Sequence, residues 1–166
     1  MRYASVLLLL VAVLLVAGSG CTGTPAHAKV GDTVRVHYTG TFDNGTVFDS
    51  STGREPLEFS VGAGMMIRGF DEGVVGMQEG ETKTLHIPAD RAYGHYREDL
   101  VFLVDPASIQ GGESLTAGEQ VCITLPGGQV MAGTVTGISP DGIVIDANHR
   151  LAGEDLTFSV TLVEIG

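Results

Sequence analysis

Short segments of alternating apolar and polar residues, separated by glycine-containing turns, constrain this chain to an antiparallel sheet. The first is 33–42, TVRVHYTGTF, where the period of two residues is the side-chain period of a β-strand. The Asn44-Gly45 pair that follows tolerates the positive φ angles of a hairpin turn, so VFDSS should return as a second strand. Alternation recurs at 57–61 and 82–87, and the chain ends in a long strand pattern at 154–165. The 24 glycines among 166 residues also suit a turn-rich sheet protein.

One segment has the spacing of a helix instead. Apolar residues recur at Ile67, Phe70, Val74 and Met77, and Gly80 closes the pattern. We therefore expect one short helix among the strands, which makes the fold class α+β.

The texture of the sequence changes between residues 97 and 146. Turn-forming runs such as IQGG, LPGGQ and SPDG separate three short strand patterns at 120–125, 129–138 and 142–147. This pattern predicts a small all-β module at 97–146 that is inserted into the main sheet domain.

The charge balance argues against nucleic acid as a partner. Twenty acidic residues face nine basic ones, for a formal net charge of −11, whereas phosphate binding needs clustered Lys and Arg. The two cysteines, Cys21 and Cys122, are too few for a disulfide scaffold or for the usual zinc site. Cys122 stands alone in a strand pattern, where we expect it to be buried and inert.

The N-terminus has the pattern of a targeting signal. Arg2 precedes Val6–Ala17, an apolar run of 12 residues. A membrane-spanning helix needs about 20 apolar residues, so a secretory signal is the better interpretation.

Two cleavage sites compete at the end of this signal. GSG precedes Cys21, as in a lipoprotein signal whose Cys is lipidated and becomes the new N-terminus, whereas AHA, ending at Ala28, fits ordinary secretion. We favour Cys21, which gives a lipoprotein-type signal peptide at 1–21 and a flexible linker at 22–28. An uncleaved anchor is the third alternative. All three place the folded part outside the cytoplasm, attached to the membrane or secreted.

Four separated motifs resemble FKBP-type peptidyl-prolyl cis-trans isomerases. They are VRVHYTGTFDNGTVFDSS, PLEFSVGAGMMIRGFDEGVVGMQEGE, IPADRAYG and LTFSVTLVEI, and the resemblance covers nearly everything after residue 28. AYGHYREDLV and DANHRLAGEDLTFSV further resemble the SlyD-like branch, in which a chaperone module called the insert-in-flap domain follows the AYG loop. The resemblance implies an FKBP-like antiparallel half-barrel sheet wrapped on one short helix. Its two parts would be 29–96 and 147–166, with the insert at 97–146.

The resemblance also implies an apolar pocket with Tyr38, Asp49 and Tyr93 as its catalytic residues. The Tyr93 hydroxyl would donate to a substrate carbonyl, and the alternative is a tyrosine bonded to its own backbone. Met65 could add an adaptable rim. The substrate-binding positions that match the family are Phe48, Leu57, Phe59, Met66, Ile67, Phe70 and Phe158.

An apolar pocket suits rotation about an X-Pro bond, for which the barrier is about 18–20 kcal/mol. Twisting leaves the amide less polar, and apolar surroundings disfavour the planar ground state. No bond is made or cut, so we expect no cofactor and no metal, and Asp49 should hold Tyr38 in place rather than move a proton. His95 and His149 are expected to be surface or structural residues, with His149 shaping the loop NHRLAG.

The expected function is a prolyl isomerase and folding helper for proteins outside the cytoplasm. The insert would bind unfolded or proline-containing polypeptides through open strand edges and raise their concentration near the pocket. A lipid at Cys21 would attach the protein to the membrane. The alternative is a binding module that recognises proline or unfolded chains without turnover.

Overall fold

The larger of two sheets carries the helix and holds both ends of the described chain. The computed structural model describes residues 26–109, 114–124, 128 and 130–166. The elements of the larger part are β1 (Thr33–Phe42), β2 (Val47–Ser50), β3 (Leu57–Ser60), α1 (Arg68–Val74), β4 (Thr82–Ile87), the short 3-10 helix η1 (Ala89–Arg91) and β9 (Leu156–Ile165). The sheet is antiparallel in the order β2-β1-β9-β4, and β3 pairs with the first residues of β1.

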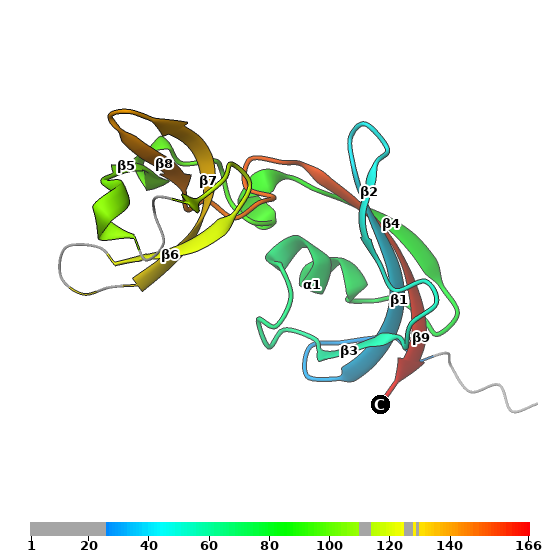
Figure 1. The fold of residues 1–166 in the computed structure, drawn as a ribbon. Helices are drawn as coiled ribbons and strands as arrows, with labels where there is room; N and C mark the ends of the chain where they lie inside the picture. The colour runs from blue at the N-terminus through cyan, green and yellow to red at the C-terminus, as the bar shows by residue number, and fades with distance from the viewer. Residues whose placement is uncertain (1–25, 110–113, 125–127, 129) are drawn as a thin grey trace, which may run out of the picture.

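The second sheet lies apart from the first (Figure 1). Two chain segments join them, one after η1 and one between β8 and β9. Its strand order is antiparallel β5-β8-β7-β6. Its elements are η2 (Glu98–Leu100), β5 (Val101–Val104), η3 (Pro106–Ser108), β6 (Gln120–Thr124), β7 (Val130–Ser139) and β8 (Gly142–Asp146). Antiparallel sheets with one short α-helix confirm the predicted α+β, FKBP-like fold class.

The β1–β2 hairpin forms at the predicted Asn-Gly turn. Gly45 has a φ of 81°, a conformation that a residue without Cβ adopts without strain. The Asn44 side chain accepts a 2.9 Å hydrogen bond from the Thr46 amide and closes the turn. The resulting register pairs Gly40 with Asp49, which sets the positions of the site residues described below.

The core of the first sheet lies between the sheet and α1 (Figure 1). Val36, Val160 and Leu162 have no exposed surface. The helix approaches β4 closely because Gly69 has no side chain, since a Cβ there would stand 2.4 Å from Cγ2 of Ile87. Replacing this glycine would push α1 away from the sheet.

The helix is shorter than the apolar spacing predicts. It ends at Val74, not near Gly80. Gly76 turns the chain with a φ of 85°, and its amide donates to the carbonyl of Ala28 at 2.7 Å. A left-handed glycine just after the C-cap residue Val75 is a common way for a helix to end, and the contact with Ala28 holds this turn in place. The apolar spacing continues past this glycine to Met77, which is why the predicted helix was too long.

That same segment corrects the end of the predicted linker at 22–28. Ala28 is 2% exposed, and its amide donates to the Met77 carbonyl at 2.9 Å. His27 forms a β-bridge with Gln78. His27 and Ala28 are thus part of the fold. The signal peptide at 1–21 and Cys21 lie outside the described residues, and none of the described helices is long and apolar enough to cross a membrane.

The second sheet contains the three predicted strands and one that was missed. The missed strand is β5, VFLV, which pairs only with β8 and shows no period-two alternation. The expectation that Cys122 is buried is wrong: its thiol is free and exposed. Val121 and Ile123 on either side of it are buried, so the strand alternation turns Cys122 outward. Ile143 and Ile145 form the centre of this sheet's own core.

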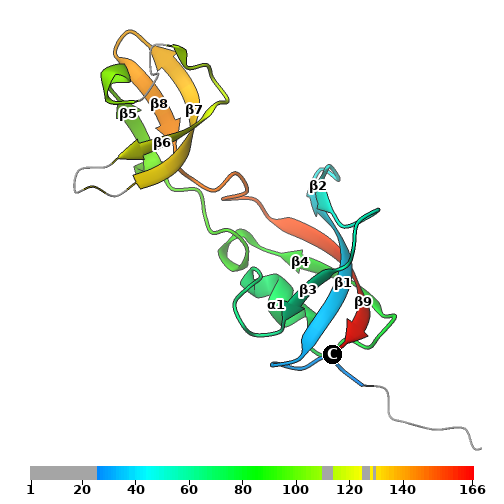
Figure 2. The same ribbon diagram turned by 60° about the horizontal axis from the view of Figure 1, so that its bottom comes forward.

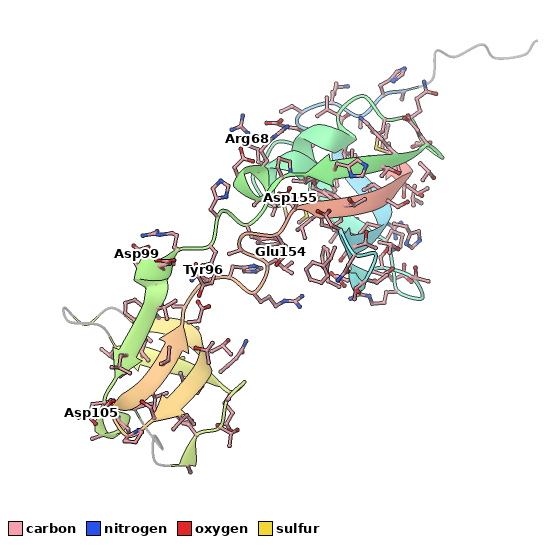
Figure 3. The ribbon with its side chains drawn as sticks, turned by 90° about the horizontal axis from the view of Figure 1, so that it is seen from above. Arg68, Tyr96, Asp99, Asp105, Glu154 and Asp155 are labelled. Carbon is pink, nitrogen blue, oxygen red and sulfur yellow. The ribbon has the colours of Figure 1, made fainter. Side chains whose placement is uncertain are left out.

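Two short segments, around residues 96–97 and 146–148, form a neck between the two sheets (Figures 2 and 3). The amide and carbonyl of Arg97 bond the side chain of Asn148 at 2.9 and 2.8 Å, as a strand partner would. The Tyr96 hydroxyl, which Figure 3 labels at this junction, donates to Asp146 at 2.9 Å. The ingoing and outgoing segments are therefore paired along the neck.

Candidate active site

A cavity of about 220 Å³ opens between the β1–β2 hairpin, α1 and the loop that follows η1. Its walls are mostly aromatic and aliphatic side chains. The residues that line it are Tyr38, Phe48, Asp49, Leu57, Met65, Met66, Ile67, Phe70, Tyr93 and Phe158. The structure thus brings together all the predicted site residues except Phe59.

Phe59 lies beneath the cavity and does not line it. It is 2% exposed and packs against Phe70, with ring centroids 5.9 Å apart. Leu57 and Phe59 share one face of β3, but Phe59 pairs with Val34, further from Tyr38 along β1. The resemblance to the family implied a substrate-binding position for Phe59, whereas the register of β3 places Phe59 beneath the lining, in contact with Phe70.

Four aromatic rings meet at Phe158, which is 5% exposed. Its ring meets Phe70 at 5.3 Å and Phe48 at 5.5 Å between centroids, both edge to face, and Tyr38 at 6.2 Å. Edge-to-face contacts are a favoured geometry for aromatic pairs. Gly40 makes room for this cluster, because a Cβ there would stand 2.5 Å from Cζ of Phe48.

One wall of the cavity is polar and internally bonded. The Tyr38 hydroxyl donates to Oδ2 of Asp49 at 2.6 Å. Oδ1 of Asp49 accepts from the Ser50 amide at 2.8 Å and from the Arg54 guanidinium at 2.9 Å. Both carboxylate oxygens therefore already have donors.

These contacts favour an ionised Asp49 beside a neutral Tyr38. The hydrogen bond from Tyr38 lowers the pKa of Asp49, helped by Ser50 and Arg54 and opposed by partial burial. Burial, followed by the hydrogen bond to Asp49, raises the pKa of Tyr38. Because the pKa of Asp49 is lowered on folding, its contribution to stability is present above about pH 4 and is lost as the pH falls through its folded value.

Tyr93 is a partly exposed residue at the rim of the cavity. Its ring stacks on the ring of His149 with centroids 3.9 Å apart and planes 1° from parallel. Among the described residues, no hydrogen-bond partner reaches the Tyr93 hydroxyl, so a bond to its own backbone is not found. Nδ1 of His149 accepts from the Leu151 amide at 3.2 Å, which shapes the loop in which His149 lies. Tyr93 and His149 lie far apart in the sequence, and no local pattern predicts that their rings stack.

Metal ligands do not gather at the cavity. Nowhere in the described ranges do three His, Cys, Asp or Glu side chains form a group that could hold a metal ion. The cavity has apolar walls, the hydrogen-bonded carboxylate of Asp49, and the Tyr93 hydroxyl, which has no hydrogen-bond partner among the described residues.

Comparison with known proteins agrees with the fold and the cavity. The family described as FKBP-type peptidyl-prolyl cis-trans isomerase matches residues 24–163. SlyD of Vibrio cholerae, named as an isomerase of this type, is 34% identical over 128 residues, or 77% of this chain and 63% of the relative. FK506-binding protein 2 of Candida glabrata is 56% identical over 69 residues, which are 40% of this chain and 51% of the relative. Human FKBP2, named as a peptidyl-prolyl cis-trans isomerase, is 40% identical over 92 residues, which are 55% of this chain and 60% of the relative.

These alignments span between about half and just under two thirds of the length of each relative. The family match, by contrast, extends over most of this chain and includes every residue that lines the cavity. The chain belongs to the FKBP-type peptidyl-prolyl cis-trans isomerase family.

Proposed function

We propose that the protein catalyses cis–trans isomerisation of X-Pro peptide bonds in the cavity between Tyr38 and Tyr93. The observation that carries this proposal is the apolar ring of side chains around Phe158 and Phe70. Family membership supports the same conclusion. The substrates would be proline-containing polypeptides, as the names of the relatives suggest.

The cavity favours the twisted amide over the planar one. A planar X-Pro amide is charge-separated, and it keeps this polarity poorly where aromatic walls replace water. The twisted form is less polar and loses less on entering, so binding is stronger near the transition state than in the ground state. No proton moves and no covalent intermediate forms.

Asp49 acts in this mechanism by holding Tyr38. Its two oxygens accept from Tyr38, Ser50 and Arg54, so most of the acceptor capacity of the carboxylate is already used. Its carboxylate stays charged through the neutral pH range. The bonded pair gives one edge of the cavity a fixed polarity without acid–base chemistry.

The activity is tested with a proline tetrapeptide, on the intact chain and on Asp49→Asn. We expect the intact chain to accelerate isomerisation and Asp49→Asn to lower kcat/KM only about three- to tenfold, the size of one or two lost hydrogen bonds. Tyr38→Phe is the matched control, because it removes the same bond from the other side.

Two outcomes would contradict these expectations. A loss of about a thousandfold in Asp49→Asn with an intact fold would indicate an acid–base role. No acceleration by the intact chain, with binding to unfolded protein retained, would identify a binding module without turnover.

We further propose that the second sheet is a SlyD-like insert that binds unfolded chains. Its outer strands β5 and β6 each have one free edge among the described residues, and free edges can pair with an extended peptide. Leu103 on β5 and Ile138 on β7 are 62% and 53% exposed. The similarity to SlyD supports this assignment, because it covers more residues than the chain has outside 97–146.

A location outside the cytoplasm, with a lipid at Cys21, is the third part of the proposal. The Val6–Ala17 run and the small residues before Cys21 support it. Ala28 supports cleavage at Cys21 over cleavage after residue 28. Cleavage after Ala28 would remove a buried residue whose amide and carbonyl both bond the Gly76–Met77 turn.

Labelling cells with a radioactive fatty-acid precursor tests the anchor. We expect the intact protein to incorporate the label and Cys21→Ser to lose it, because lipidation needs the Cys21 thiol. Cys122→Ser is the matched control and should keep the label, since it removes the other, exposed thiol. An unlabelled intact protein, or a labelled Cys21→Ser, would rule out this anchor.

A further inference from the structure

Tyr93 and His149 are in contact although the segment that forms the second sheet separates them in the sequence. Tyr93 precedes β5, and His149 follows β8. Their rings lie face to face, 3.9 Å apart and parallel within 1°. Tyr93 also lines the cavity, whereas His149 does not. His149 therefore contacts a residue of the cavity lining without lining the cavity itself.

We propose that His149 is a positioning residue, which holds the Tyr93 ring at the rim of the cavity and keeps its hydroxyl directed to a bound peptide. The proposal rests on the proposed isomerase function. It assigns to His149 a role in substrate binding that the cavity lining alone does not suggest.

The stack is the specific support of the Tyr93 side chain. The backbone beside it is fixed, because the Gly94 amide donates to Ala89 and its carbonyl accepts from Gly153, both at 2.8 Å. The side chain itself is 38% exposed, and among the described residues no hydrogen bond holds its hydroxyl. Without the imidazole face, rotation about the side-chain bonds would let the ring leave the rim.

The imidazole fits this role in its neutral form. Nδ1 of His149 accepts from the Leu151 amide at 3.2 Å, and a protonated Nδ1 would present a second donor to that amide. Partial burial, followed by the neighbouring charge of Arg150, lowers the pKa of His149. A lowered pKa keeps the ring neutral at pH 7, and protonation follows only as the pH falls below about 6.5.

Few charged groups lie around this ring. Arg150 is the charged neighbour and Tyr93 is the titratable group stacked on it. A shallow cleft of about 380 Å³ brings Gln120 of β6 and Thr134 of β7 near His149, and both of these are uncharged. The titration of His149 therefore governs the pH response of the stack.

A double-mutant cycle with Tyr93→Ala tests the proposal in the full chain. His149→Asn removes the ring and keeps an acceptor for the amide two residues on, as Asn does in turns. We expect His149→Asn to raise KM for a proline tetrapeptide about three- to tenfold with little change in kcat, the size of a lost ring contact. In the Tyr93→Ala background the same change should have no further effect.

Two further variants separate the stack from the fold. His149→Phe keeps a flat ring and should restore KM to within about twofold of the intact chain. His95→Ala removes an exposed histidine from the loop that contains Tyr93 and should leave KM unchanged. An equal increase in KM from His149→Asn with and without Tyr93, or no increase at all, would overturn the proposal.

The pH profile gives a readout that a purely structural role would not move. We expect kcat/KM, followed by NMR exchange without a coupled protease, to fall as the pH drops below about 6.5, and this decline to vanish in His149→Phe. The Tyr93 ring protons should shift with the His149 titration in the intact chain. Absence of isomerase activity in the intact chain would disprove the proposed function. Chemical shifts of the Tyr93 ring protons that do not change as His149 titrates would disprove the positioning role.

Discussion

Replacing Val101–Asp146 with a two-residue Asn-Gly turn should slow catalysis of proline-limited protein refolding about a hundredfold, through loss of effective concentration. The same change should leave tetrapeptide isomerisation within about threefold, because the cavity residues come only from the first sheet and its loops. The replacement is sterically reasonable, since the Ala147 amide already bonds the Leu100 carbonyl at 2.9 Å. Each sheet also has its own buried core.

A matched variant distinguishes tethering from mere presence of the second sheet. Leu103→Ser with Ile138→Ser removes exposed apolar surface and keeps the sheet intact. It should weaken protein refolding less than the replacement and spare the tetrapeptide. Equal losses on the tetrapeptide and the protein substrate would contradict the tethering role, because they would indicate damage to the cavity.

Phe158→Ala is expected to lower the free energy of unfolding of the first sheet by about 3–5 kcal/mol. The residue is 5% exposed and its ring contacts Tyr38, Phe48 and Phe70, so truncation leaves a void among aromatic side chains. This loss is a large part of the about 5–15 kcal/mol that stabilises a typical domain. Urea unfolding followed by circular dichroism measures it, since the chain has no Trp.

Val163→Ala on the same strand is the control for Phe158→Ala. Val163 is 41% exposed, and its truncation should change the free energy of unfolding by about 0.5 kcal/mol or less. The unfolding of the second sheet should be unaffected in both variants, because Phe158 belongs to the other core. Similar losses in the two variants would show that the aromatic cluster does not hold this sheet together.

Features set by neighbouring residues were predictable from the sequence. The Asn44-Gly45 turn, the strand at 82–87 and the final strand each follow from turn chemistry or period-two alternation, which are local signals. The short β5 strand escaped because an edge strand with a continuous apolar run has no alternation. The period of a short continuous apolar run does not distinguish a strand from a helical segment.

Features set by distant contacts were not predictable in this way. The turn at Gly76 is held by a bond to Ala28, and apolar spacing, which continues to Met77, cannot include that partner. The depth of Phe59 depends on its pairing with Val34, whereas alternation predicts only its face. The sequence of the whole second sheet separates His149 from Tyr93, so their contact at the rim of the cavity depends on tertiary structure.

The central position of β9 has a consequence for the order in which this protein folds. β9 lies between β1 and β4, so the first sheet lacks this central strand until residues 156–165 are available to pair. The strands β5 to β8 are contiguous in sequence, and contacts of short sequence separation form sooner than distant ones. In a chain that emerges from its N-terminus, the second sheet can therefore be complete while the cavity is still open on one side.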